Sequence, residues 1–254
     1  MIDLIRGVEM KVVCLFDPAK GEGPLTVTLV AQKPLPKVIE PLIGQLFEHL
    51  AVLVSTQGLS PGRDDAKLSV QGVSFSADGQ TAIVALQLDA VPAVAWRVLL
   101  GLLSAFSKLS AALLEFRLEQ PGYKGAARSE KDLIAAPYPE TDTSADFDLS
   151  HEESASDDAN VEVTFTKGVP KAVRGEIEAA MNAWLETATG GFFKDSDPPG
   201  YNAHDCPEVT RAGARVLIAS FDTWEGDEGA FRAVINQMAH FQRLHGCIES
   251  VSVE

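Results

Sequence analysis

Apolar residues recur along the chain with two different periods. Val27 and Leu29 alternate with polar neighbours, which is the pattern of a strand with one buried face. Four larger apolar residues follow at spacings of four, four and three, which places their side chains on one face of a helix. They are Ile39, Ile43, Phe47 and Leu50. The pattern predicts a strand that leads into a helix.

The same pattern returns 134 residues later, where Val161 and Val163 correspond to Val27 and Leu29. A helical stripe follows again, formed by Val173, Ile177, Met181 and Trp184. Each helix is preceded by a Pro-Lys pair, Pro36-Lys37 in the first copy and Pro170-Lys171 in the second. Proline suits the first turn of a helix because its missing N–H needs no partner there. A shift of this size indicates a duplicated domain, since it is too long for a solenoid repeat.

A second matching helix follows in each half. Its stripe consists of Trp96, Leu99, Leu103 and Phe106 in the first copy and of Phe231, Val234, Met238 and Phe241 in the second. The buried-strand pattern at 83–86 precedes the first of these helices, and 216–219 precedes the second. The last strand alternates through Leu114, Phe116 and Leu118, but Glu249 stands in the second copy at the place of Leu114. We interpret this mismatch as fraying of a terminal strand.

With strands at 67–76 and 208–212 added, each half has the order β-α-β-β-α-β, which resembles the ferredoxin-like fold. This resemblance implies an α+β protein with tandem ferredoxin-like domains, each with two helices on one face of an antiparallel sheet. We expect the first domain at 1–125, with an extra strand near its N-terminus, and the second at 161–254. The fold hosts many unrelated functions and therefore does not indicate one.

Residues 126–160 are predicted to form an acidic linker. Its part from 139 to 160 contains eight acidic residues and no Lys or Arg, so it buries too little apolar area to offset its ordering entropy. We expect a flexible tether, which Phe147 and Leu149 could anchor to a domain surface. A motif that binds a partner is the alternative interpretation.

Composition limits the compartment and the possible partners. The 36 acidic residues outnumber the 21 basic ones, so the formal net charge is −15, which disfavours nucleic acid and anionic lipid and favours basic partners. The first twenty residues lack a secretory signal pattern, and no apolar stretch reaches the ~20 residues of a membrane helix. Cys14, Cys206 and Cys247 are odd in number and far apart, which suits reduced thiols. We expect a cytoplasmic protein without membrane contact.

Sequence motifs with a direct catalytic meaning are absent. The chain has no G-x-S-x-G, no phosphate loop, no G-x-G-x-x-G and no C-x-x-C. A site built from His204 and Cys206 with His240, His245 and Cys247 is conceivable, but the two helix histidines are five residues apart and diverge. We predict no catalytic residue, metal or cofactor.

The long connection at 190–206 distinguishes the second copy from the first. It carries aromatic and acidic residues among glycines and prolines, and long loops of this kind often contact a partner. Packing of these aromatics onto their own domain is the alternative. The predicted partner-binding residues are Phe192, Phe193, Asp195, Asp197, Tyr201 and Asp205, together with Asp157 and Asp158 of the linker.

The acidic loops, the paired domains and the lack of catalytic motifs give the chain a resemblance to bacterial toxin-immunity proteins. This resemblance implies an inhibitor that binds a basic protein toxin, with acidic groups that steer association and aromatic residues that supply affinity. The alternative is a protein that binds a small molecule in the cleft between the domains. A third hypothesis, an enzyme, requires His204 and Cys206 to face one concavity.

Overall fold

The computed structural model describes residues 10–109, 112–151, 159–189, 208–221 and 228–253. The first half contains β1 (Lys11–Leu15), β2 (Gly23–Ala31), α1 (Glu40–Ser55), β3 (Lys67–Phe75), β4 (Thr81–Asp89), α2 (Val94–Leu109) and β5 (Leu113–Glu119). A short helix α3 (Glu130–Ile134) follows. The second half contains β6 (Asp148–His151), β7 (Ala159–Phe165), α4 (Lys171–Thr189), β8 (Glu208–Ala212), β9 (Val216–Phe221), α5 (Glu228–His245) and β10 (Ile248–Val253).

Each half forms one five-stranded sheet, and the two sheets have equivalent strand orders. These orders are β1-β5-β2-β4-β3 and β6-β10-β7-β9-β8. The protein is therefore a mixed α+β structure in which one arrangement of strands and long helices occurs twice. The extra strand predicted ahead of the first copy is present, and β6 is its equivalent ahead of the second copy.

The prediction of purely antiparallel sheets is wrong, because β1 pairs in parallel with β5 and β6 pairs in parallel with β10. The cause is the position of the last strand in each half. In the first half, β1 and β2 are joined by a short connection and run in opposite directions, and β5 lies between them. A strand inserted between two antiparallel strands must be parallel to one of them, and β5 is antiparallel to β2.

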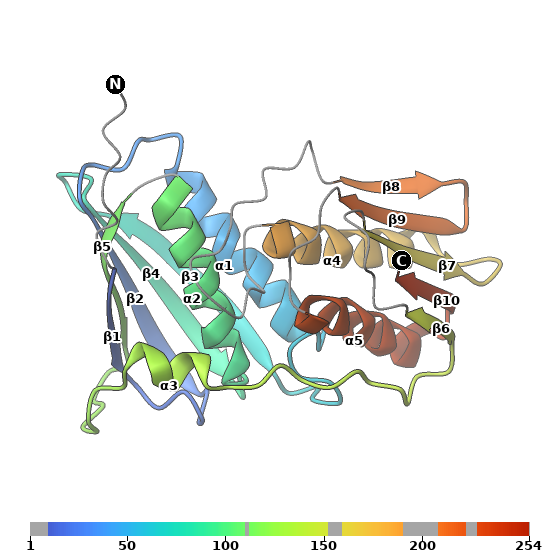
Figure 1. The fold of residues 1–254 in the computed structure, drawn as a ribbon, viewed down its shortest axis with the longest axis horizontal. Coiled ribbons are helices and arrows are strands. Elements are labelled where there is room, and N and C mark those ends of the chain that lie inside the picture. Colours follow the sequence, from blue (N-terminus) through green and yellow to red (C-terminus); the bar gives the residue numbers. More distant parts are fainter. Residues whose placement is uncertain (1–9, 110–111, 152–158, 190–207, 222–227, 254) are drawn as a thin grey trace.

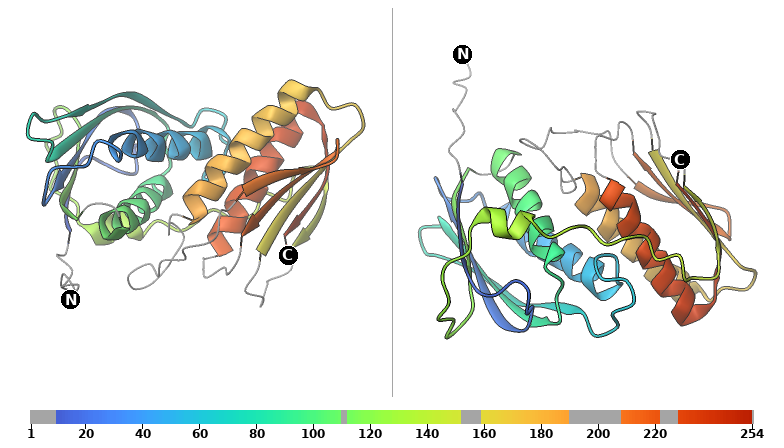
Figure 2. Two further views of the ribbon diagram at one scale, coloured as in Figure 1. Left: turned by 90° about the horizontal axis from the view of Figure 1, so that it is seen from above. Right: turned by 60° about the horizontal axis from the view of Figure 1, so that its bottom comes forward.

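The helices of the two halves face each other in the middle of the molecule, and one sheet forms each outer side (Figures 1 and 2). Helices α1 and α2 cover the inner face of the first sheet, and α4 and α5 cover the inner face of the second. The predicted stripes point into these layers: Phe47, Leu99, Met181 and Val234 have no exposed surface. Among the described residues, no helix is long and apolar enough to span a membrane.

The two matching Pro-Lys pairs do not mark the same helix start. Helix α4 begins directly after Pro170, as predicted, whereas α1 begins at Glu40 with Pro41 in its first turn. Residues 36–39 form a separate turn, in which the N–H of Ile39 donates to the carbonyl of Pro36 at 2.8 Å. Pro41 takes the position in the first turn that we expected for Pro36, since proline is tolerated there.

The mismatch between Leu114 and Glu249 is not fraying but a β-bulge that occurs in both halves. The register of β5 against β2 shifts at Leu114, and the register of β10 against β7 shifts at Glu249. A bulge turns the extra residue out of the normal alternation. The buried side chains at this place are therefore Leu113 and Ile248, while Leu114 is 36% exposed. Glu249 pairs with Arg215 on the surface.

The segment expected to be a free acidic tether is bound to the fold along its described part. Leu133 of α3 is buried, and Arg97 of α2 lies 4.1 Å from the ring centre of Tyr138. Further along, the amide side chains of Asn236 and Gln242 donate to the carbonyls of Glu140 and Asp146. Helix α5 thus holds the segment that leads into β6.

Phe147 packs against the core, as expected of an anchor, whereas Leu149 stays 38% exposed. The segment is bound because α5 donates hydrogen bonds to the segment's backbone carbonyls. The expectation of a free tether considered only the apolar area that the segment can bury and did not count these hydrogen bonds.

The shared bulge predicts different costs for two neighbouring substitutions. Leu113→Ala should lower the free energy of unfolding by about 2–4 kcal/mol, because it leaves a cavity at a fully buried site. Leu114→Ala should cost about 1 kcal/mol or less, because the side chain lies on the exposed side of the bulge. Urea denaturation of both variants measures the difference. Equal costs would show that the two residues do not occupy the positions described.

Candidate functional site

All eight sequence-predicted partner-binding residues lie outside the described residues. They are Phe192, Phe193, Asp195, Asp197, Tyr201 and Asp205 of the long connection and Asp157 and Asp158 of the linker. His204 and Cys206 also lie outside them. Their role in binding therefore stays a prediction.

The strand residues that flank these two segments lie at one end of the second sheet. His151, before the first segment, and Val161, just after it, both pair with Val253 of β10. After the second segment, Glu208 pairs with Ser220 at the end of β9. Ser220 in turn pairs with Asn160, so these positions are neighbours across the sheet. The topology thus brings both flanks of the first predicted contact segment and the C-terminal flank of the second to the same end of the sheet.

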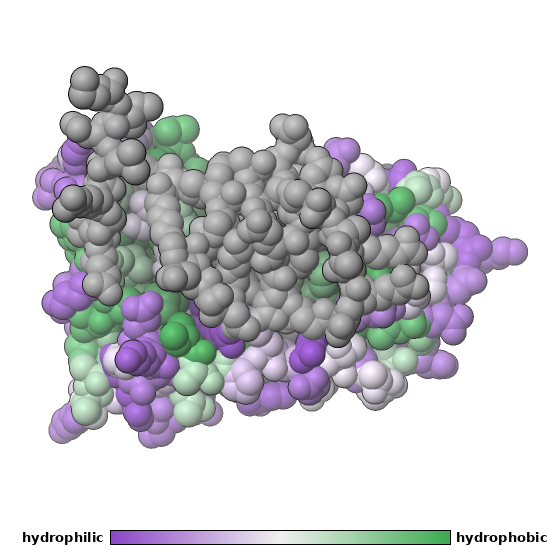
Figure 3. Space-filling view, viewed as in Figure 1, coloured by the Kyte–Doolittle hydropathy of each residue, from purple (hydrophilic) through white to green (hydrophobic). Residues whose placement is uncertain are grey.

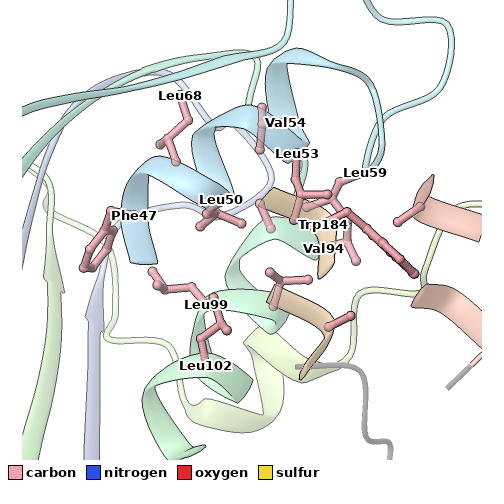
Figure 4. Packing of buried hydrophobic residues seen from close by; sticks show 14 of the residues in the cluster. Phe47, Leu50, Leu53, Val54, Leu59, Leu68, Val94, Leu99, Leu102 and Trp184 are labelled. Atoms are coloured by element: carbon pink, nitrogen blue, oxygen red, sulfur yellow. The ribbon is translucent and has the colours of Figure 1, made fainter. Parts of the chain in front are cut away.

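The junction between the two halves is the place where the small-molecule alternative requires a cleft. Helices α1 and α4 are in contact there. Figure 4 shows Trp184 of α4 in one group of buried side chains with Leu53, Leu59 and Val94 of the first half. All four side chains are at least 95% buried, and the indole N–H of Trp184 donates to the carbonyl of Ala230 at 2.8 Å. In the part of the junction that the structure describes, packed side chains fill this position.

A polar network also joins the halves. It consists of Gln57 in the turn after α1, Asp64, Asp142 of the segment before β6, and Arg243 of α5. Arg243 Nη2 donates to the side-chain oxygen of Gln57 at 2.6 Å, and Arg243 Nη1 donates to the carboxylate of Asp142. The amide nitrogen of Gln57 donates to Asp64. Gln57 is fully buried, so this junction network satisfies its polar group inside the protein.

The backbone around Gln57 is shaped for a close approach to α5. Gln57 has a φ of 60°, in the left-handed region. A Cβ added to the next residue, Gly58, would lie 3.1 Å from the carbonyl oxygen of Ala233 and 3.1 Å from Cγ of Gln237. Gln237 Nε2 donates to the hydroxyl of Thr56 at 2.6 Å. A side chain at position 58 would therefore require the turn or the helix to shift by a few tenths of an ångström.

Two buried polar atoms in this region have no hydrogen-bond partner, Ser60 Oγ and Gln237 Oε1. An ordered water could serve such atoms.

Burial alone would raise the pKa of Asp142, but hydrogen bonds from Ser144 and Arg243 outweigh it and lower the pKa below its ordinary value. The side chain of Asp142 is only 11% exposed. Asp142 is therefore a charged, mostly buried partner of Arg243, and the junction network includes a partly desolvated ion pair.

The described cysteines and helix histidines do not form a reactive centre. Burial raises the pKa of the Cys14 thiol to about 11 and also raises the pKa of Cys247, so both thiols stay protonated near neutral pH. Burial and the nearby Arg243 lower the pKa of His240. His245 stacks on the ring of Phe241. Within the described ranges, no group of three or more potential metal-ligating side chains comes together.

In the part of the chain that the structure describes, no helix lies on the outer face of either sheet, and the two faces differ in charge. On the first sheet, Glu115 accepts hydrogen bonds from Lys11 at 3.2 Å and from Arg117 at 2.7 Å. These hydrogen bonds lower the pKa of Glu115 against the opposing effect of burial, with that from Arg117 the largest cause. Arg117 also lies 3.5 Å from Glu119. Two basic and two acidic side chains therefore neutralise one another on this face.

The outer face of the second sheet carries carboxylates without such compensation. Asp148, Glu162 and Glu208 are exposed there, between hydroxyl side chains such as Thr164 and Ser250. No Lys or Arg occupies an outward position on the described strands of this sheet, since Arg211 of β8 pairs with Glu178 of α4 on the inner side. Hydrophilic residues also gather at the far end of this half, around the turns after β7 and β8 (Figure 3).

Sequence reasoning did not single out this face, although a signal was present. Glu162 and Thr164 alternate with the buried Val161 and Val163, so their outward direction follows from the strand period. β6 was not predicted, and without it the outward position of Asp148 could not be inferred.

Comparisons with known proteins do not identify the chain. No family model and no curated protein matches it. Among solved structures, the ferredoxin protease FusC in complex with Arabidopsis ferredoxin is 8% identical with a TM-score of 0.24, over 92% of this chain and 42% of that one. An unknown protein from Galdieria sulphuraria is 9% identical with a TM-score of 0.20, over 91% and 96%. The periplasmic protease PqqL from Escherichia coli is 10% identical with a TM-score of 0.22, over 88% and 34%.

The chain spans less than half the length of both named proteases. At these TM-scores the likeness does not establish a shared fold.

The junction network predicts a pH-dependent contribution to stability. Asp142→Asn should lower the free energy of unfolding at neutral pH by about 1–2 kcal/mol, because it removes a charged acceptor from Arg243 and Ser144. The folded-state pKa of Asp142 is lowered, so this stabilisation is present above the unfolded-state pKa and is lost as pH falls through the folded-state value. Chemical denaturation between neutral and acidic pH measures it.

Glu140→Gln is the matched control, because Glu140 is 88% exposed where it pairs with Arg232. Its cost should stay within about 0.5 kcal/mol. A difference between Asp142→Asn and the parent protein that does not change with pH would contradict the assignment.

Proposed function

We propose that the protein is an inhibitor of the immunity type, which binds a basic protein toxin in the cytoplasm and neutralises it by covering its basic surface. The observation that carries this proposal is a net charge of −15, together with the uncompensated carboxylates on one outer face of the fold. A protein with this negative charge has an electrostatic potential that attracts basic partners and speeds their association.

The architecture supports this proposal because the outer faces of the two sheets are broad and are held in place by packed helices. Helices α1 and α4 pack against each other between the halves, and no helix among the described residues covers the outer side of either sheet. Within each half, four strands are mutually antiparallel, in the order β5-β2-β4-β3 in the first half and β10-β7-β9-β8 in the second. The remaining strand, β1 or β6, adds a parallel edge to each sheet. We assign both halves on this basis to a variant of the ferredoxin-like arrangement.

The alternative function, small-molecule binding between the domains, has one observation in its favour. Ser60 Oγ and Gln237 Oε1 are buried at the junction without a partner, and a ligand could supply one. Against it, the described part of the junction is filled by side chains such as Leu59 and Trp184. Ligand pockets are concave and largely preformed, so we favour the inhibitor.

The proposal predicts a salt-sensitive complex with a basic protein encoded beside this one. The two purified proteins should form a complex at low ionic strength, and the association rate should fall as salt screens the opposite charges. Stopped-flow or biosensor measurements at several salt concentrations test this, and inhibition of the toxin's activity in the same mixtures tests the function. The absence of a complex at low salt would argue against the proposal.

A further inference from the structure

The carboxylates on the outer face of the second sheet follow a diagonal. The register across the strands places Asp148 beside Ser250 and Thr164, Glu162 beside Ser252 and Ile218, and Glu208 beside Ser220. Each carboxylate is thus displaced from the previous one by two strands across the sheet and by one outward position along the strands. We call the row Asp148, Glu162 and Glu208 the acidic diagonal.

The spacing of the acidic diagonal decides what it can bind. Neighbouring strands are about 4.8 Å apart and successive outward residues about 6.8 Å apart, so consecutive carboxylates are separated by about 12 Å. Oxygen ligands of a single hard cation lie within about 2.6 Å of the ion, so these carboxylates cannot share one. An extended row of this kind fits several separate basic side chains on one macromolecular partner.

The duplication provides an internal comparison for this face. The position of Glu162 on β7 corresponds to that of Thr28 on β2, and the carboxylates of Glu115 and Glu119 on the first sheet are neutralised by Lys11 and Arg117. The same backbone arrangement therefore presents a balanced face in one half and an acidic face in the other. Short hydroxyl side chains lie between the carboxylates, so the acidic face is rich in hydrogen-bonding groups.

We propose that the outer face of the second sheet, along the acidic diagonal, is the docking surface for a basic protein partner. This inference rests on the proposed function and specifies where that partner binds. Charge complementarity is the reason for choosing this face over the first sheet, whose charges are already paired. Lys or Arg side chains of the partner would approach Asp148, Glu162 and Glu208, and the hydroxyl groups between them would accept or donate hydrogen bonds.

The test compares two charge reversals that change the net charge equally. Glu162→Lys reverses the centre of the acidic diagonal, and Glu119→Lys reverses an outward residue of the first sheet. The probe is a lysine homopeptide of about 20 residues, because it carries the proposed chemistry without a fold of its own. Binding is measured by fluorescence anisotropy at low ionic strength, and thermal melts verify that both variants stay folded.

Glu162→Lys should weaken binding by roughly fivefold or more, which corresponds to about 1 kcal/mol, and Glu119→Lys should weaken it by less than twofold. The double variant Glu162→Gln with Glu208→Gln should also weaken binding, since it removes two charges without adding one. NMR shift changes on β6 to β10 should accompany peptide binding. Equal losses in Glu162→Lys and Glu119→Lys would overturn the inference, because binding would then follow net charge alone.

Failure of the docking surface and failure of the proposed function are distinguishable. If the neighbouring toxin is bound and inhibited equally well by Glu162→Lys and by the parent protein, the function stands and the docking surface is wrong. If the peptide binds at the acidic diagonal but no toxin is inhibited, the surface stands and the inhibitor function is wrong.

Discussion

Where α4 of the second half meets α1 of the first, the side chain of Trp184 is completely buried. The packing of these two helices against each other determines which faces of the two sheets are left exposed. Helices α1 and α4 each cover part of their own sheet and also pack against each other, so these two helices have neighbours on both sides. Within the described ranges, the outer side of each sheet therefore remains without a helix.

The junction combines an apolar part and a polar part, and the two parts have different physical roles. Burial of Leu53, Leu59 and Trp184 supplies affinity between the halves, because it removes apolar surface from water without directional requirements. The network of Gln57 and Arg243 supplies orientation, because its hydrogen bonds form in only one arrangement. Gly58 allows the turn to approach α5 closely, since an added Cβ there would lie 3.1 Å from the carbonyl oxygen of Ala233.

The periodic parts of the fold could be predicted from the sequence, and the parts set by distant residues could not. The helical stripes and the buried Val27 and Val161 follow from local spacing. The bulge at Leu114 breaks the period of two, and the glutamate at the equivalent position in the second half was its visible signal. The parallel edge strands depend on where β5 and β10 insert, which no local pattern records.

The prediction of a free tether before β6 was wrong for a related reason. This segment is held by hydrogen-bond donors on α5 and not by its own apolar residues, so its composition did not indicate the contact. The aromatic and acidic contact residues of the long connection could be proposed from the sequence, but they lie outside the described residues. Prediction of the acidic outer face of the second sheet would have required the strand register as well. Only the pairing of β6 with β10 places Asp148 on the same face as Glu162.

The two outer faces show how an acidic surface can be kept at little cost to the fold. On the first sheet, Glu115 and Arg117 are close enough to form hydrogen bonds, so their charges cancel locally. On the second sheet the carboxylates are about 12 Å apart, which exceeds the screening length of about 8 Å at physiological ionic strength. Their mutual repulsion is therefore small, while each still attracts a basic group that comes close. At this spacing each of the three carboxylates would interact with a separate basic side chain of the proposed partner.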